Sequence, residues 1–159
     1  MKQDILPLQY LNCSKGDNTN WNLSFNHAQG FKGGSSLQIT SKNNSEDSYS
    51  SFLLYEFIEG NFKPDKLSIS YFNSGIDIIF SVGNNHSTLF FSEDKSINFI
   101  KETSEDNIIF PNLIECKNEW KVCSFEFPYP IEVISIKIHC KPRNRNENEY
   151  CLLGQLILT

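Results

Sequence analysis

Apolar and polar residues alternate with a period of two along many short segments of the chain. In residues 66–72, apolar side chains occupy positions 67, 69 and 71, and polar side chains occupy positions 66, 68 and 70. Residues 133–140 alternate in the same way, with Ile134, Ile136, Ile138 and Cys140 on one side and Ser135, Lys137 and His139 on the other. This period predicts strands with one buried and one solvated face. We expect strands over residues 4–11, 37–40, 51–57, 66–72, 76–82, 88–91, 120–127, 133–140 and 150–158.

Turn-forming residues separate these segments. Gly33-Gly34, residues 73–75, residues 83–85 and residues 142–144 carry the clearest turn signals. Residues 73–75 lie between two apolar runs and predict a tight hairpin. Polar residues 42–50 and 144–149 predict exposed loops, and residues 101–107 predict a loop or one helical turn. No repeat or linker divides the chain, so we expect residues 1–159 to form a single antiparallel β-sandwich.

Composition supports an all-β fold and narrows the class of protein. The chain has 159 residues, one alanine and 13% aromatic residues, which excludes an all-α fold and a disordered chain. It is too short for a (β/α)8 barrel, which needs about 250 residues. Its net charge is −5, whereas nucleic-acid-binding domains usually carry a basic surplus. We therefore expect no nucleic-acid partner.

The cysteines and the N-terminal residues indicate a cytoplasmic protein. Five cysteines stand at irregular spacing without a CxxC pair: Cys13, Cys116, Cys123, Cys140 and Cys151. An odd number at such spacing is typical of reduced thiols rather than of a secreted disulfide framework or a zinc site. No apolar stretch is long enough for a signal peptide or a membrane span, so we expect no membrane partner.

The sequence contains no recognisable catalytic set. The three histidines share no metal-ligand spacing, and His139 is expected to be solvated on the outer face of its strand. There is no GxSxG elbow, and residues 30–36 lack the ending of a P-loop. We expect no catalytic residue and no cofactor. A structural calcium ion is the one metal that loop acids could hold, at residues 46–47, 93–94 or 105–106.

Two places in the sequence suit contact with a sugar. Trp21 follows the polar residues 15–20, and a half-exposed tryptophan beside amides is typical of sugar stacking, although a core or rim position is the alternative. Asn84, Asn85 and His86 form a lesser candidate loop between two strands. Trp120 begins an alternating strand and is expected in the core.

Two stretches of the chain resemble a known family. Residues 28–39 read AQGFKGGSSLQI, and residues 120–157 contain Trp120, Cys123, an apolar strand, a polar loop and the run Leu153-Gly154-Gln155-Leu156. Together they resemble the β-sandwich region that follows the catalytic barrel in cytosolic endo-β-N-acetylglucosaminidases of glycoside hydrolase family 85. Gln155 replaces the usual acid of the Leu-Gly-Glu pattern, and no position matches the catalytic Asn and Glu of the barrel.

The resemblance implies a jelly-roll or galactose-binding-domain-like accessory module without catalysis of its own. The parent enzyme would hydrolyse the chitobiose core of N-glycans in the cytosol, and the partner would be an N-glycan or the parent's catalytic barrel. Two other functions stay open: a free-standing cytosolic lectin-like module, and a protein-interaction sandwich without sugar affinity. A docking face would be apolar, whereas a sugar site would be a groove with exposed aromatic and amide side chains.

Overall fold

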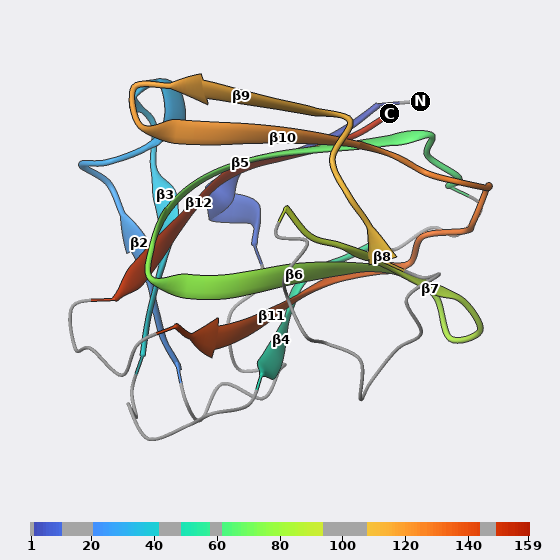
Figure 1. The fold of residues 1–159 in the computed structure, drawn as a ribbon, viewed down its shortest axis with the longest axis horizontal. Helices are drawn as coiled ribbons and strands as arrows, with labels where there is room; N and C mark the ends of the chain where they lie inside the picture. The colour runs from blue at the N-terminus through green and yellow to red at the C-terminus, as the bar shows by residue number, and fades with distance from the viewer. Residues whose placement is uncertain (1, 11–20, 42–48, 58–61, 94–107, 144–148) are drawn as a thin grey trace.

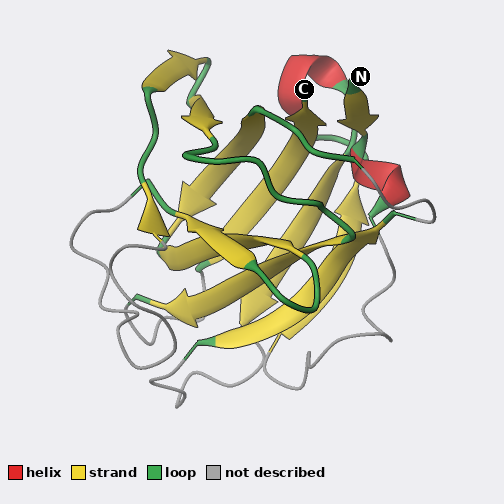
Figure 2. Ribbon diagram, turned by 90° about the vertical axis from the view of Figure 1, so that its right-hand side faces the viewer, coloured by secondary structure: helices red, strands yellow, loops and turns green. Residues whose placement is uncertain are grey.

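The chain folds into two β-sheets that pack face to face (Figures 1 and 2). A computed structural model describes residues 2–10, 21–41, 49–57, 62–93, 108–143 and 149–159. The seven-stranded sheet has the order β2 (Trp21–Asn26), β3 (Ser36–Ser41), β12 (Tyr150–Leu158), β5 (Lys66–Ser74), β10 (Trp120–Glu126) and β9 (Leu113–Lys117), with β1 (Gln3–Ile5) paired to β12. The five-stranded sheet has the order β4 (Ser50–Glu56), β11 (Ser135–Pro142), β6 (Ile76–Gly83), β7 (Thr88–Phe91) and β8 (Ile108–Ile109). Strand pairs are antiparallel except β7 and β8, which confirms the predicted all-β sandwich.

The alternating positions become the core between the sheets. Leu67, Ile69 and Tyr71 of β5 are buried, and they face the other sheet. Ile136 and Ile138 of β11 are fully buried from the opposite side. The predicted inner faces of these two strands are therefore confirmed.

The first predicted strand is shorter than expected. Residues 4–11 do not continue as one strand, because β1 ends at Ile5 and a 3-10 turn follows over Pro7–Gln9. Proline has no N–H to donate and its fixed φ suits the first position of a helical turn. The Gln9 side chain accepts the backbone N–H of Leu6 at 2.9 Å, which closes this turn.

Three strands lie outside the predicted set, namely β2, the two-residue β8, and β9. Strand β2 has the alternating pattern of a strand, whereas all five residues of β9 are exposed. An exposed edge strand buries neither face, so the period of two carries no signal there. The predicted exposed loop over residues 144–149 and the segment over residues 101–107 lie almost wholly outside the described residues.

The predicted hairpin at residues 73–75 is wrong. Strand β5 belongs to the seven-stranded sheet and β6 to the five-stranded sheet, so the two strands do not pair with each other (Figure 1). The chain crosses between the sheets at Gly75, which has a φ of 94°. The Asn73 side chain holds the crossing through the N–H and the carbonyl of Ile76. A turn-forming sequence thus predicts where the chain bends, but it does not predict whether the two flanking strands pair with each other.

The turn predicted at Gly33-Gly34 is present and leads into a strand. Lys32 and Gly33 have φ values of 59° and 84°, in the region that favours glycine, and β3 begins at Ser36. The turn includes the short 3-10 segment η3 (Phe31–Gly33). Phe31 lies beside Trp120, with ring centroids 5.9 Å apart.

Trp120 is buried, as expected, but it lies outside the core between the sheets. Its neighbour Lys121 pairs with the inward-facing Tyr71, so Trp120 and Phe72 occupy the outer face of the seven-stranded sheet. Phe31 covers Trp120 on this face.

Among the described residues, no helix has the length and apolar character that crossing a membrane requires.

Candidate functional site

A groove runs across the outer face of the five-stranded sheet. We call it the outer groove; its volume is about 230 Å³. Three strands, β11, β6 and β7, and the loop between β6 and β7 contribute its side chains. The lining residues are Ser81, Gly83, Asn84, Asn85, Thr88, Phe90, Ser135, Lys137 and His139.

Strand register explains why this face is hollow. Lys137 of β11 lies opposite Ser81 of β6, and Ser81 lies opposite Phe90 of β7. In the next row, Ser135, Gly83 and Thr88 align in the same way. The central strand β6 therefore carries the small residues of both rows and forms the floor of the groove. The larger Lys137 and Phe90, on the strands to either side, form its two walls. At a strand spacing of about 4.8 Å, these walls are about 10 Å apart.

Gly83 is required at the floor of the outer groove. A Cβ atom at this position would lie 2.1 Å from the carbonyl oxygen of Ser87 and 2.9 Å from the Cα of Thr88. Both atoms belong to the backbone of the loop and cannot move away cheaply. Glycine thus allows the loop to fold back closely onto β6.

The loop predicted as the lesser sugar candidate lies at the outer groove. Asn84 and Asn85 line it, whereas His86 is exposed on the same loop and is not a lining residue. The Asn84 side chain accepts the N–H groups of His86 and Ser87 and donates to the carbonyl of Glu132, so it holds the loop in shape. Asn85 is exposed, and within the described part of the chain its side chain has no hydrogen-bond partner. Asn85 is therefore the residue of this loop that is available to a ligand.

His139 lies deeper in the outer groove than the sequence suggested. Its Nε2 is 2.9 Å from the Ser81 hydroxyl, and its ring centroid is 5.8 Å from that of Phe90. Burial, together with the charge of Lys137, lowers the pKa of His139 from 6.5 to about 4. The expectation of a solvated His139 is wrong: the imidazole faces outward but is half-buried and neutral at pH 7.

Of the two positions considered for Trp21, the structure shows the core position, and the half-exposed position needed for sugar stacking is wrong. The ring is 1% exposed, within the core between the sheets, and its Nε1 donates to the Ser50 hydroxyl. The polar residues before Trp21 suggested a solvated ring. Strand β2 instead turns Trp21 toward the other sheet, opposite Ser41 of β3. A ring in this position has no free face for stacking on a sugar.

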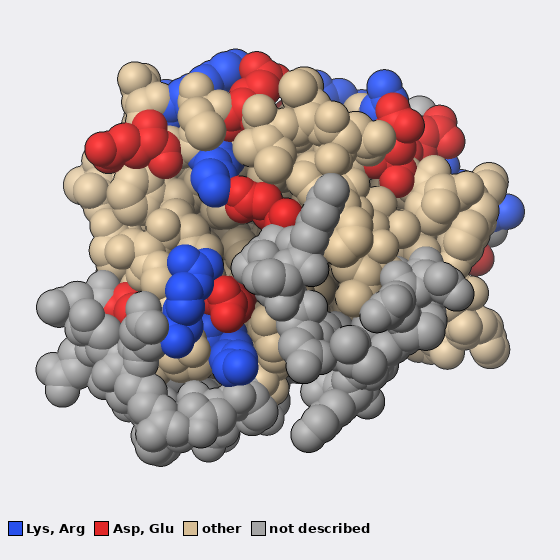
Figure 3. Space-filling view, viewed as in Figure 1, with Lys and Arg blue, Asp and Glu red and all other residues tan. Residues whose placement is uncertain are grey.

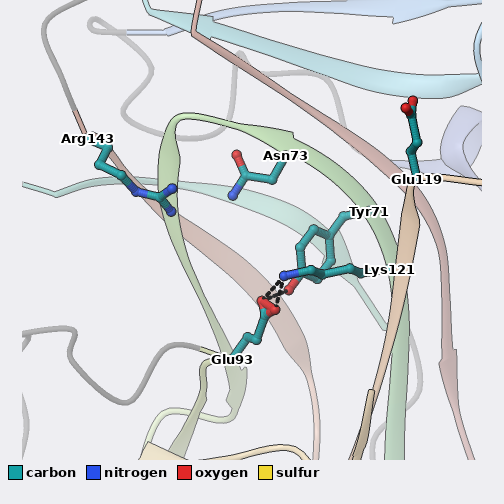
Figure 4. A pocket seen from close by; sticks show the side chains of 6 residues that line it. All are labelled: Tyr71, Asn73, Glu93, Glu119, Lys121 and Arg143. Atoms are coloured by element: carbon teal, nitrogen blue, oxygen red, sulfur yellow. Dashed lines mark hydrogen bonds and ion pairs between the residues drawn. The ribbon is translucent and has the colours of Figure 1, made fainter. Parts of the chain in front are cut away.

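A second pocket lies at the end of the sandwich where β5 crosses to β6. We call it the end pocket; it has a volume of about 120 Å³ and is lined by Tyr71, Asn73, Glu93, Glu119, Lys121 and Arg143 (Figure 4). Tyr71 and Lys121 converge on Glu93, whereas Glu119 points away from them. The Tyr71 hydroxyl donates to Glu93 Oε2 at 2.8 Å, and Lys121 Nζ binds the same carboxylate. This bond raises the pKa of Lys121.

Most side chains of the end pocket are already paired. Arg143 Nε donates to Asp77 Oδ1 at 3.0 Å, and Asn73 is held by Ile76. Basic and acidic side chains accordingly lie side by side on this face of the molecule (Figure 3). Glu93 follows strand β7 and its partners belong to β5 and β10, so the cluster joins the two sheets. These contacts fit a structural clamp better than a binding site.

The acids considered for calcium are only partly described. Glu93 is occupied by Tyr71 and Lys121, and residues 46–47, 94 and 105–106 lie outside the described residues. Over the described ranges, no three His, Cys, Asp or Glu side chains come together in a way that would hold a metal ion.

The outer groove carries several polar side chains without partners among the described residues, whereas the charged side chains that line the end pocket, apart from Glu119, are paired. Within the described residues, Asn85, Thr88, Ser135 and Lys137 have no hydrogen bond or ion pair through their side chains. Phe90, Lys137 and His139 were missed as site residues by sequence reasoning. The alternation of 135, 137 and 139 already placed them on one outer face, but their neighbours on β6 and β7 depend on strand order.

Fold and groove together define an antiparallel β-sandwich with a polar and aromatic hollow on one sheet. Comparison with solved structures finds this sandwich in the glycoside hydrolase domain of Endo-D from Streptococcus pneumoniae R6, with a TM-score of 0.54 and 11% identity. The match covers 99% of the present chain and 21% of that domain, so the chain spans about a fifth of its length.

A second structure with the same fold is a mutant family 29 carbohydrate-binding module complexed with mannohexaose. Its TM-score is 0.51 at 12% identity, and the match covers 99% of this chain and 90% of that module. No protein-family model and no curated protein matches the sequence. At these identities the likeness establishes the sandwich fold.

Proposed function

We propose that the chain is a carbohydrate-binding β-sandwich whose site is the outer groove. The observation that carries this proposal is the combination of one aromatic ring with uncommitted hydroxyl, amide and ammonium groups in a single hollow. Sugar binding needs an apolar ring face and several polar groups at fixed positions. The complex of the similar family 29 module with mannohexaose adds support for this ligand class.

Each wall of the outer groove has its own role in this proposal. Phe90 offers a ring face to one side of the sugar, and His139 packs beside Phe90 as a neutral imidazole. Asn85, Thr88 and Ser135 supply donors and acceptors for hydroxyl groups. A spacing of about 10 Å between Lys137 and Phe90 accommodates one pyranose ring between them.

Calorimetric titration of a high-mannose N-glycan oligosaccharide and of mannohexaose tests the proposal. We expect binding by the wild type, weakened about tenfold in Phe90→Ala and about three- to tenfold in Asn85→Ala. Phe25→Ala and Asn22→Ala are matched controls, because both residues are exposed on β2 of the other sheet. These controls should leave the affinity unchanged.

Two results would count against the outer groove. Equal affinities in wild type, Phe90→Ala and Asn85→Ala would move the sugar site elsewhere on the molecule. No binding to the wild type at millimolar sugar would favour the third function, a protein-interaction sandwich. A melting curve for each variant separates loss of the site from loss of the fold.

We further propose that the chain is a non-catalytic module of a cytosolic family 85 endo-β-N-acetylglucosaminidase. The supporting observation is that 99% of the chain matches a part of the Endo-D glycoside hydrolase domain, in line with the resemblance of residues 28–39 and 120–157. In this case the full gene product carries a catalytic barrel. Without such a barrel, the chain is a free-standing lectin-like module.

The departure at Gln155 has a local explanation that is compatible with this proposal. Gln155 Nε2 donates to Asp4 Oδ1, and its backbone N–H donates to the Ser70 hydroxyl at 2.9 Å. A glutamate at position 155 would place a second carboxylate against Asp4. Glutamine is therefore the residue that suits an acid at position 4.

Enzyme assay and gene length test the module proposal. The present chain should release no glycan from a high-mannose glycopeptide, and its full gene product should be longer by several hundred residues. Turnover by the pure chain, abolished by one point mutation, would contradict the non-catalytic role. A gene product of only 159 residues would favour the lectin-like module.

A further inference from the structure

The outer groove carries a positive charge, although the protein as a whole is acidic. Among the described residues, Lys137 is the only lining residue with a charged side chain, since His139 is neutral and no described Asp or Glu lines the groove. The chain as a whole has 19 acidic and 14 basic residues. A hollow with a cation and without an acid therefore runs against the overall balance of the molecule.

Lys137 differs from the basic residues of the end pocket. Lys121 binds Glu93 and Arg143 binds Asp77, whereas Lys137 is exposed and, within the described residues, has no ion pair or hydrogen bond. Glu56 of β4 lies opposite Ser135 in the register, but it is engaged in an interaction of its own and does not line the groove. The Lys137 ammonium group is thus available to a ligand.

We propose that the outer groove selects a glycan that carries an anionic group, either a carboxylate or a phosphate monoester. Lys137 pairs with the anion, and Phe90 on the opposite wall packs against the adjoining sugar ring. Thr88, Ser135 and Asn85 donate to the remaining oxygens. Lysine suits this role because its ammonium group is a compact charge that binds either anion without demanding a bidentate geometry. This inference rests on the proposed sugar site and adds the class of sugar.

Two matched pairs of probes test it. The first pair is a high-mannose oligosaccharide and the same oligosaccharide with a 6-phosphate; the second is N-acetyllactosamine and its sialylated form. At low ionic strength, we expect the anionic member of at least one pair to bind about tenfold more tightly than its neutral counterpart. Added salt should reduce this advantage. The pair that shows the preference identifies phosphate or carboxylate as the anion.

Lys137→Gln assigns the preference to one side chain. The variant should bind the neutral and the anionic member of the pair with equal affinity. Lys117→Gln is the control, because Lys117 is exposed on β9 of the other sheet and should leave the preference intact. Lys137 is exposed and unpaired, so its replacement should leave the melting temperature unchanged.

The outcomes separate this inference from the proposed function. Neutral and anionic probes that bind equally to the wild type overturn the charge selection but leave the sugar site in place. A preference that survives in Lys137→Gln also overturns it. If no probe binds at millimolar concentration, the sugar site itself is wrong, and the inference fails with it.

Discussion

At the scale of single residues, His139 shows how a neighbouring side chain changes the chemistry of a histidine. Its ring lies between Ser81 and Phe90, where water has little access, and Lys137 adds a positive charge. Both effects disfavour the imidazolium form. The folded protein therefore keeps His139 neutral down to a pH well below the value at which an unfolded chain would protonate it.

This shift makes the stability of the protein dependent on pH. The pKa of His139 is about 4 in the folded state against 6.5 in the unfolded state, so its contribution is complete above pH 6.5 and is lost as the pH falls toward 4. At about 1.4 kcal/mol per pKa unit, and with allowance for partial exposure, we expect the free energy of unfolding to fall by an amount on the order of 2 kcal/mol.

Denaturant unfolding between pH 7.5 and 4 should show this dependence on pH in wild type and not in His139→Gln. His86→Gln, at an exposed histidine, should keep the wild-type slope. Equal slopes in wild type and His139→Gln would contradict the shift.

The two tryptophans show where reasoning about single residues stops. The residues around Trp21 fit either a half-exposed or a core ring, and the ring lies in the core. Those around Trp120 predict a core ring, but it lies under Phe31 on the outer face of its sheet. The local sequence shows which residues along the chain are polar or apolar. It does not show which distant segment of the chain packs over a given side chain. Burial of a single ring is therefore decided by packing between distant segments.

At the scale of elements, strands that have one buried face could be predicted closely. Strand β12 covers the predicted residues 150–158, and β7 covers residues 88–91. The loop at residues 83–85 was also predicted, together with Asn84 and Asn85. Their place beside Phe90 and Lys137 was not predictable, because it depends on β11, β6 and β7 being neighbours. Each strand of the site can therefore be predicted from local sequence, whereas the site itself forms only through the order of the strands in the sheet.

Elements of the two sheets meet at Glu93, and this contact should contribute measurably to stability. Glu93→Ala removes the acceptor of the Tyr71 hydroxyl, and Tyr71 is only 4% exposed. A buried hydroxyl that loses its charged partner costs about 1–3 kcal/mol. The pair with Lys121 adds less, since that side chain is 45% exposed.

Denaturant unfolding of Glu93→Ala should show this loss. Glu119→Ala is the matched control, because Glu119 lines the same pocket, is exposed, and should change the free energy of unfolding by less than about 0.5 kcal/mol. In the double variant Glu93→Ala with Tyr71→Phe, the loss should be smaller than the sum of the two single losses, since both changes remove the same Tyr71–Glu93 hydrogen bond, although Tyr71→Phe also removes the contact of the hydroxyl with Cys123 Sγ. Additive losses would mean that Glu93 and Tyr71 act independently.

At the scale of the whole molecule, the sandwich follows from the sequence but its connections do not. Alternation predicted two sheets that bury apolar faces against each other, and the sheets are built in this way. The residues around Gly75 predict a hairpin but form a crossing between the sheets, because the same residue types suit both kinds of turn. Which strands pair is decided by contacts between residues far apart in the chain, such as Gln3 with Leu158. The two ends of the chain accordingly lie close together in Figure 1. A single sequence carries little information on such pairs.

Buried cysteines lie in both sheets, so their reactivity measures whether the whole sandwich is folded. Cys123 and Cys151 are buried in the seven-stranded sheet and Cys140 in the five-stranded sheet, whereas Cys116 is exposed on β9. Burial raises the pKa of all three buried thiols, so they lack both access to reagent and the reactive thiolate form.

Thiol titration should therefore separate Cys116 from the other described cysteines. In a Cys13→Ser background, which removes the cysteine outside the described residues, one thiol per chain should react rapidly with Ellman's reagent in the folded state. Three more should react after denaturation without reductant, and under native conditions they should react only as fast as the sandwich opens. Cys116→Ser should abolish the rapid phase and leave the slow one unchanged. Rapid reaction of a second thiol would mean that one sheet opens independently of the other. Fewer than four thiols after denaturation would indicate a disulfide, which would contradict the predicted reduced thiols.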